Sequence, residues 1–191
     1  MTLKYCKTRK VKSPARAHET DAGIDFFVPE DLTTEIMAEK FEKTGCHVDM
    51  ELAEDGKTIK CFILKPNESI LIPSGIKMKV PEGYMLQYNN KSGVASKRGL
   101  LVGASVVDVG YEGECHINLH NVSKFSQMIS AGDKIVQGIL VPVGFHTPEE
   151  VKDEHELYGD KMSERGINGF GSTGSRWFSF FHYQTHLYLN I

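Results

Sequence analysis

The densest group of candidate ligand-binding residues lies between residues 165 and 174, with the sequence Arg-Gly-Ile-Asn-Gly-Phe-Gly-Ser-Thr-Gly. Its glycines allow the backbone to approach a ligand closely and to turn N–H groups towards an anion. Arg165 adds a bidentate phosphate contact, and Ser172 and Thr173 add hydroxyl donors. Phe170 adds a ring that can stack on a base. The alternative is a flexible Gly-Ser linker, but phosphate binding explains the arginine and the hydroxyls better.

A second candidate anion site runs from Asn90 through Lys91, Ser92 and Gly93 to Lys97. A lysine, a serine and a glycine at the start of a possible short helix offer a positive charge, a hydroxyl and free backbone N–H groups to an oxyanion. The alternative is an ordinary helix start, because many helices that bind nothing begin with a similar string.

A third candidate site lies in residues 103–114, where a carboxylate follows an apolar segment and precedes a glycine turn. Asp108 is a candidate general base, and Tyr111 offers a ring against which a sugar can pack. The alternative is a plain turn aspartate, and the local pattern favours neither interpretation over the other.

The elements that must position these residues are short strands separated by turn residues. Proline and glycine in residues 73–75 and 81–83 predict tight turns between apolar segments. Residues 115–120 alternate strictly, which places His116, Asn118 and His120 on one strand face and Ile117 and Leu119 on the other. Residues 135–143 form a longer apolar run that fits a strand buried on both faces. We therefore predict an all-β sandwich, jelly roll or barrel, with further strands at residues 69–73, 76–80 and 84–88.

Two segments depart from this β pattern. Residues 31–44 predict a helix whose apolar face ends at Gly45, a glycine placed as a C-cap, and a polar hairpin follows at residues 53–56. We interpret residues from about 30 to about 60 as an insertion. The second departure is the tail at 175–191, which is rich in aromatic residues and apolar at most odd positions. The tail could pair as one more strand. The apolar face of the predicted helix consists of Leu32, Ile36, Met37 and Phe41.

Length and composition limit the class of protein. A chain of 191 residues with 40% hydrophobic residues suits one domain, or one domain with an insertion. Its net charge of −3 argues against an electrostatic nucleic-acid surface. Residues 1–12 are polar and basic and no apolar run reaches the length of a membrane helix, so we expect neither a signal peptide nor a membrane span. Four scattered cysteines suit reduced thiols, so we expect a cytoplasmic location.

The order and spacing of these segments resemble the trimeric dUTPases, a family with five ordered motifs on a β jelly roll. The motifs correspond here to residues 21–25, 91–95, 107–114, 132–137 and 165–174. The resemblance implies a dUTPase-like jelly-roll domain over residues 1–174, with a mobile C-terminal arm at about 159–174. It also implies a homotrimer whose active sites are shared between subunits.

The implied activity is hydrolysis of dUTP to dUMP and pyrophosphate, which keeps uracil out of DNA and supplies dUMP for thymidylate synthesis. The resemblance implies that Asp108 activates the attacking water and that Asp25 holds Mg²⁺ through a metal-bound water. Tyr111 would pack on the deoxyribose, and the backbone from Gly103 and Ala104 to Val107 would bind uracil. Phe170 would cover the base. The implied phosphate-binding residues are Lys91, Ser92, Gly93 and Gln137, with Arg165, Gly171, Ser172 and Thr173 on the arm.

The chain departs from the family pattern at three positions. Lys91 stands where the family has arginine, Asn90 where it has proline, and Ser105 where it often has glycine. Lysine keeps the positive charge but loses the planar fork of arginine, so we expect a different phosphate geometry. None of the three departures removes a catalytic group.

Two alternatives to a dUTPase remain open. A dCTP deaminase shares the jelly roll, but its chemistry requires a general-base glutamate where this chain has Asn118. The second alternative is a regulatory, nucleotide-gated protein-binding module, with a partner bound through the insertion or the tail.

Overall fold

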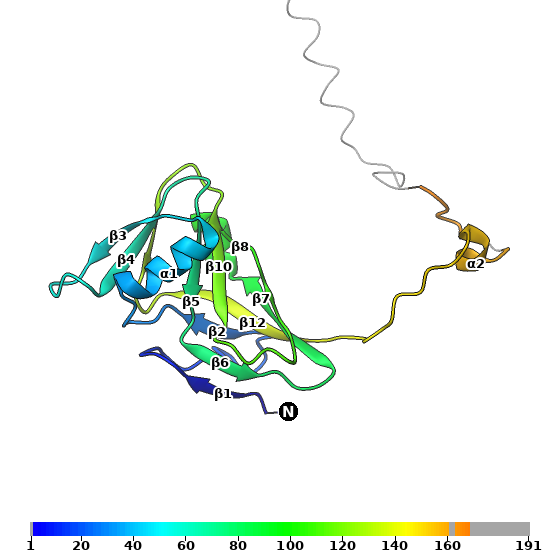
Figure 1. Cartoon of the computed structure of the whole chain (residues 1–191), viewed down its shortest axis with the longest axis horizontal. Helices are drawn as coiled ribbons and strands as arrows, with labels where there is room; N and C mark the ends of the chain where they lie inside the picture. The colour runs from blue at the N-terminus through cyan, green and yellow to red at the C-terminus, as the bar shows by residue number, and fades with distance from the viewer. Residues whose placement is uncertain (1, 161–162, 169–191) are drawn as a thin grey trace, which may run out of the picture. The chain divides into compact units, whose positions relative to one another are not determined.

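The computed structural model describes residues 2–160 and 163–168 (Figure 1). The chain forms two compact units, Met1–Phe145 and His146–Ile191. The first unit therefore ends before the arm predicted from about residue 159. In the second unit the structure describes a short helix, α2 (Glu154–Tyr158), which the sequence did not predict. The Asp153 side chain caps this helix by accepting hydrogen bonds from the N–H groups of His155 and Glu156.

The first unit is built mostly of short strands, which confirms the all-β prediction. All of its strand pairs are antiparallel. Turns at the predicted proline and glycine positions separate several of them. Among the described residues the strands are β1 (Lys4–Lys7), β2 (Ile24–Phe27), β3 (Asp49–Leu52), β4 (Ile59–Leu64), β5 (Ser69–Pro73), β6 (Ile76–Lys79), β7 (Tyr84–Asn90), β8 (Leu100–Val102), β9 (Val106–Val107), β10 (His116–Asn121), β11 (Gln127–Ser130) and β12 (Lys134–Pro142).

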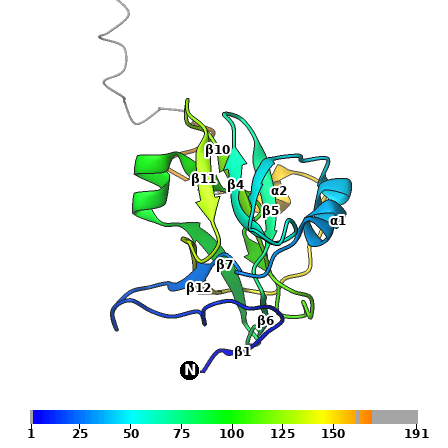
Figure 2. The same cartoon turned by 90° about the vertical axis from the view of Figure 1, so that its left-hand side faces the viewer.

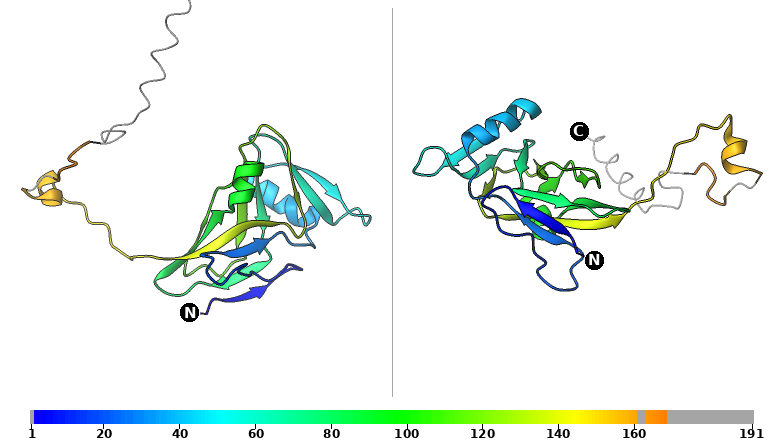
Figure 3. Two further views of the ribbon diagram at one scale, coloured as in Figure 1. Left: turned by 180° about the vertical axis from the view of Figure 1, so that it is seen from behind. Right: turned by 60° about the horizontal axis from the view of Figure 1, so that its bottom comes forward.

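These strands form four small sheets, with the orders β1-β6, β5-β10-β8, β11-β4-β3 and β2-β12-β7-β9. Many neighbours within a sheet are distant in sequence, so the sheets are held together by long-range pairing. The views in Figures 2 and 3 show β1 beside β6 at the edge of the unit and β12 running beside β2.

The four-stranded sheet brings the first, second and fourth motifs together. Its register places Asp25 of β2 opposite Gln137 of β12, and Gln137 opposite Asn89 of β7. Close packing behind these residues keeps the strands in place. The rings of Phe26 and Tyr88 meet edge to face at 5.0 Å between centroids.

Strand β10 follows the predicted alternation. Ile117 and Leu119 are both 0% exposed, whereas His116 and Asn118 are half-buried and His120 is exposed. Strand β12 matches its prediction only in part. Ile135 and Val136 are consecutive and both buried, but its second half is only partly covered within this chain.

The predicted helix is present as α1 (Thr34–Thr44). Thr33 caps its first turn, and Gly45 ends it in the left-handed conformation with φ +69°. Met37 and Phe41 are buried, and Figure 2 shows α1 beside β5, with which it is in contact. The predicted insertion is also joined to the β structure, because β3 pairs with β4 and β4 pairs with β11. In the described part of the chain, no helix is long and apolar enough to span a membrane.

Candidate active site

Residues of the first, second and fourth motifs line one pocket of about 550 Å³, here called the Lys91 pocket. The predicted phosphate-binding residues Lys91, Ser92, Gly93 and Gln137 all line it. Three further cations, Lys97, Arg98 and Lys134, line it as well. The sequence analysis did not assign these three residues, although Lys134 lies inside the fourth motif and Lys97 ends the second candidate string. A pocket with four cationic side chains is suited to a polyanion.

Asp25 lies beside this pocket and is only 6% exposed. Both of its carboxylate oxygens are ion-paired, Oδ1 with the Lys91 amine and Oδ2 with the Lys134 amine, the latter at 3.0 Å. Burial alone would raise the pKa of Asp25, but the hydrogen bonds from the two lysines hold this pKa below its ordinary value. The carboxylate is therefore charged, and its single negative charge is shared between two of the four cations, so the pocket keeps a positive excess near Lys91 and Lys134.

Gln137 is positioned by its neighbours on both sides. Its amide donates a hydrogen bond to the Asn90 carbonyl at 2.9 Å. A Cβ at Gly23 would lie only 2.6 Å from Gln137 Oε1, so glycine in the first motif leaves the space that this side chain needs. The first and fourth motifs thus pack directly against each other.

The second motif leads into a π-helical turn, η1 (Val94–Arg98), that ends at Gly99 with φ +64°. The Ser96 hydroxyl donates to the Ser92 carbonyl at 2.6 Å and closes the turn. The predicted short helix is therefore present, in π form. Its first residues place Ser92 and Gly93 on the wall of the Lys91 pocket.

The third motif lines a different pocket of about 190 Å³, here called the Asp108 pocket. The predicted residues Ala104, Val107, Asp108 and Tyr111 line it, whereas Gly103 does not. The Ser105 carbonyl accepts a hydrogen bond from the Tyr88 N–H at 2.7 Å, which joins this wall to β7. A carboxylate, a tyrosine ring and a stretch of backbone therefore face one small cavity.

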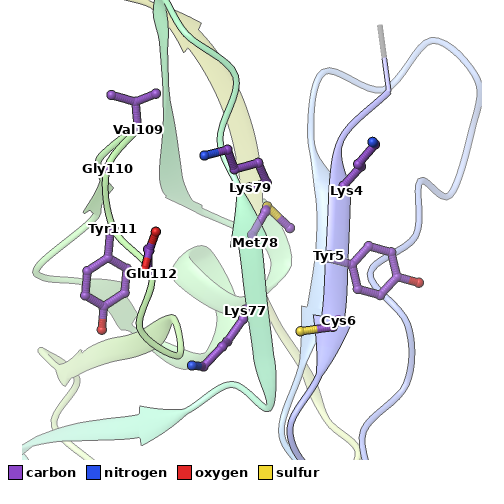
Figure 4. Close-up of a pocket in the computed structure, with 10 residues that line it drawn as sticks. All are labelled: Lys4, Tyr5, Cys6, Lys77, Met78, Lys79, Val109, Gly110, Tyr111 and Glu112. Atoms are coloured by element: carbon purple, nitrogen blue, oxygen red, sulfur yellow. The ribbon is translucent and has the colours of Figure 1, made fainter.

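Tyr111 is held in a folded-back position by its own turn. Its hydroxyl donates to the Glu114 carbonyl at 2.9 Å. A Cβ at Gly113 would lie 2.3 Å from that hydroxyl, so any other residue there would displace the Tyr111 ring from this position. Glu114 is in turn ion-paired with Arg9 at 3.0 Å and accepts a hydrogen bond from the Gly75 N–H. Figure 4 shows Tyr111 on its loop across from the β6 residues Lys77 to Lys79, in an adjoining pocket of about 270 Å³.

Three further side chains that line the Asp108 pocket were not assigned from the sequence: Tyr88, Cys115 and His116. The Tyr88 hydroxyl is buried and makes no hydrogen bond in the structure. Burial raises the pKa of this hydroxyl far above its ordinary value, so the phenol is neutral. The alternation of residues 115–120 predicted a strand here, but not that Cys115, His116 and Tyr88 would line this pocket.

The partial burial of His116 leads us to expect that the stability of the fold depends on pH. Burial lowers the pKa of His116 below its ordinary value, and the positive charge of Lys40 lowers it further. The unfolded chain therefore binds a proton at His116 before the folded protein does. As the pH drops below about 6.5, the free energy of unfolding should fall, because the unfolded state then binds more protons.

Urea unfolding measured between pH 7.5 and 5.5 checks this expectation, with His116→Gln expected to lose less stability than the wild type over this range. The matched control is His18→Gln, which changes an exposed histidine outside both pockets. Equal losses in the wild type and His116→Gln would contradict the assignment.

The fifth motif is described only at its start. Arg165 lies in the second unit, where its Nε donates to the Asn168 carbonyl at 3.1 Å. The predicted contacts of Phe170, Gly171, Ser172 and Thr173 lie outside the described residues, as does the tail at 175–191.

The Lys91 pocket and the Asp108 pocket share no lining residue. The first groups cations that suit phosphates, and the second groups a carboxylate, an aromatic ring and backbone that suit a water, a sugar and a base. The two halves of the predicted chemistry therefore occupy separate cavities of the chain.

Comparison with known proteins identifies the family. The dUTPase family model matches residues 55–174. The deoxyuridine 5'-triphosphate nucleotidohydrolase of Clostridium novyi is 33% identical over 163 residues, which cover 84% of this chain and 89% of the relative. These matches confirm the resemblance seen in the sequence and do not favour a deaminase or a separate binding module.

Solved structures agree with this assignment. The dUTPase of Staphylococcus bacteriophage 80alpha with dUPNHPP superposes with a TM-score of 0.64 at 25% identity and covers 91% of this chain and 99% of its own. A variant dUTPase from phage phi11 of S. aureus, described as coordinating a structural Mg(II) ion, has a TM-score of 0.60 at 23% identity and covers 80% of this chain and 98% of its own. The second likeness shows the shared jelly-roll fold alone. The chain belongs to the dUTPase family.

Proposed function

We propose that this protein hydrolyses dUTP to dUMP and pyrophosphate through attack of water on the α-phosphorus. The observation that carries the proposal is the composition of the Asp108 pocket, in which a carboxylate, the Tyr111 ring and the backbone at residues 104–107 face one cavity. Membership of the dUTPase family supports the same reaction.

Asp108 is the proposed general base. Its exposed position on the pocket wall leaves the carboxylate accessible to a water molecule. The carboxylate would take a proton as the water oxygen bonds to the α-phosphorus. The bond from that phosphorus to the bridging oxygen then breaks, and the leaving pyrophosphate takes the electron pair. A positioned base of this kind also orients the water for in-line attack.

The Lys91 pocket is the proposed site of the phosphates. Lys91, Lys97, Arg98 and Lys134 would neutralise the charge that builds up on the leaving pyrophosphate. Ser92, the Gly93 backbone and Gln137 would add hydrogen bonds to the phosphate oxygens. Since Lys91 is paired with Asp25 in this structure, phosphate binding would compete for its ammonium group.

Asp25 is the proposed carboxylate for Mg²⁺ that would enter together with the triphosphate. Among the described residues, no group of three or more His, Cys, Asp or Glu side chains is arranged to hold a metal ion alone. Mg²⁺ commonly keeps several waters and binds through one or two carboxylates and the substrate phosphates. One buried carboxylate, Asp25, matches that requirement through a metal-bound water. When bound, the ion would draw charge from the phosphates and hold them in one orientation.

We infer that the active enzyme is a homotrimer with shared active sites. The two pockets have no lining residue in common, which is expected if each site combines the Lys91 pocket of one subunit with the Asp108 pocket of another. The arm at residues 159–174 would then come from a third subunit, with Arg165, Ser172 and Thr173 on the phosphates and Phe170 over uracil. Four free cysteines support an intracellular, reducing location.

The direct test is pyrophosphate release measured over a panel of deoxynucleoside and ribonucleoside triphosphates in the presence of Mg²⁺. We expect dUTP to be turned over, with UTP and dCTP far behind. Preferred turnover of any other nucleotide would contradict the proposal. Release of inorganic phosphate in place of pyrophosphate would contradict the attack on the α-phosphorus.

A further inference from the structure

The segment that leads into the Asp108 pocket is tied down by two asparagines. Three consecutive backbone N–H groups donate to them. The Val102 N–H donates to Asn90 Oδ1 at 2.7 Å, and the Gly103 N–H donates to the Asn118 carbonyl at 3.0 Å. The Ala104 N–H donates to Asn118 Oδ1 at 3.0 Å. Asn90 ends β7 and Asn118 lies in β10, so the segment is held from two different strands.

The Asn118 side chain has a defined orientation. Its Nδ2 donates to the Ile70 carbonyl on β5 at 3.1 Å, so the Oδ1 atom faces the Ala104 N–H. His120 Nε2 lies 3.1 Å from the same Oδ1. Because an amide oxygen only accepts hydrogen bonds, His120 must carry its proton on Nε2 to make this contact. The Asn118 amide thus has three hydrogen-bond partners. Two of them are backbone groups, and the third is the exposed side chain of His120.

The contact between these side chains and the segment is very close. A Cβ at Gly103 would lie 2.1 Å from Asn118 Oδ1 and 2.4 Å from His120 Nε2. The φ of Gly103 is not in the left-handed region, so glycine is needed here for space and not for backbone conformation. Glycine at position 103 therefore lets the Asn118–His120 pair reach the backbone of the segment.

Holding the Ala104 N–H also fixes the direction of the Gly103 carbonyl. The peptide bond between them is planar and trans, so its C=O points opposite to its N–H and away from Asn118. Ala104 is the first residue of this segment that lines the Asp108 pocket, so the hydrogen bond fixes the point at which the proposed base-binding backbone begins. Backbone donors and acceptors held in fixed positions can discriminate between uracil, which carries a hydrogen on N3, and cytosine, which presents a lone pair there.

We propose that Asn118, supported by His120, is a positioning residue for base discrimination. By accepting a hydrogen bond from the Ala104 N–H it holds the first residue of the backbone at 104–107, which lines the Asp108 pocket and which we propose reads the edge of the base. This inference rests on the proposed function, in which residues 103–107 bind the base. It also gives a role to the side chain at the position where a deaminase would need a glutamate.

If Asn118 has this role, its substitution should weaken the discrimination between dUTP and dCTP and change the rate of the chemical step only slightly. Asn118→Leu keeps a similar volume but removes the acceptor and the donor. We expect KM for dUTP to rise about tenfold and the preference for dUTP over dCTP to fall about tenfold, the worth of one well-placed hydrogen bond. The kcat for dUTP should stay within about threefold, because Asp108 and the phosphate site are unchanged.

His120 provides a pair of variants that does not depend on the folding of Asn118→Leu. His120→Leu removes the N–H donor, whereas His120→Gln keeps an amide N–H near Asn118 Oδ1. We expect the preference for dUTP to fall about threefold in His120→Leu and to be restored in His120→Gln, since one supporting hydrogen bond contributes less than the direct one.

The experiment measures kcat and KM for dUTP, and dCTP both as a substrate and as a competitive inhibitor, on the full-length protein. The matched control is Asp31→Ala, which removes a hydrogen bond of the same kind, from the Lys10 N–H to Asp31 Oδ2 at 2.8 Å, away from both pockets. The control should keep the preference of the wild type.

An unchanged preference in both Asn118→Leu and His120→Leu would overturn the inference, whatever happens to their thermal stability. An equal loss in His120→Leu and His120→Gln would also overturn it, because the donor would then not matter. Failure of the proposed function would be visible separately, in the wild type, as a lack of preference for dUTP.

Discussion

Asp108→Asn should lower kcat for dUTP by roughly 10²–10⁴-fold, the usual contribution of a positioned general base. Asparagine has nearly the shape of aspartate but cannot take the proton of the attacking water. Binding of dUTP should survive, because the Lys91 pocket and the base-binding backbone are unchanged. Single-turnover kinetics with dUTP, together with calorimetric binding of a non-hydrolysable dUTP analogue, separate the two effects.

The matched control for this variant is Glu112→Gln, which neutralises a carboxylate on the same loop. Glu112 lines the adjoining pocket shown in Figure 4 and not the Asp108 pocket. Its variant should keep turnover within about threefold, since only exposed charge is changed. Near-normal turnover of Asp108→Asn would show that another group activates the water.

Ending the chain at Glu164 should leave a folded trimer that binds dUTP weakly and turns it over at least about 10²-fold more slowly. The deletion removes Arg165, Phe170, Ser172 and Thr173, which we propose close over the phosphates and the base. The fold should survive because every strand that the structure describes lies in the unit Met1–Phe145. Light scattering gives the oligomeric state, and steady-state kinetics give kcat and KM.

A second truncation, ending the chain at Gly174, serves as its control. It keeps the whole fifth motif and removes only the tail at 175–191. If the motif itself is responsible, this shorter deletion should retain most of the activity. Loss of the trimer in the chain that ends at Glu164 would show that the arm is structural, and equal activity of the two truncated chains would show that the motif is not needed.

Local patterns in the sequence determined the elements of the fold. The turns around Pro73 and Pro81 separate strands as predicted, and the alternation in β10 buries Ile117 and Leu119. The helix α1 ends at Gly45 because glycine adopts the left-handed conformation of a C-cap without strain. Each of these features depends on residues within a few positions of one another, which is why they can be recognised without the tertiary structure.

The sequence also identified the family, because motifs of fixed spacing are local patterns too, whereas the roles of the site residues stay predictions. Residues from three motifs then meet in the Lys91 pocket, as the resemblance implied. The pairing of Asp25 with Lys91 and Lys134 was not visible in the sequence. Those three residues lie on separate segments, and only the register of the four-stranded sheet brings them into contact.

Only the tertiary structure decided which side chains support the motifs. Asn118 and His120 lie on β10 and hold a segment that precedes them by more than ten residues. The sequence around Gly103 does not predict this contact. The absence of a side chain at Gly103 leaves space for Asn118 and His120, which lie on another strand. The division of the site into two pockets was likewise decided by the fold. Long-range pairing sets such distances, and a sequence pattern with a period of two or four residues contains no information about them.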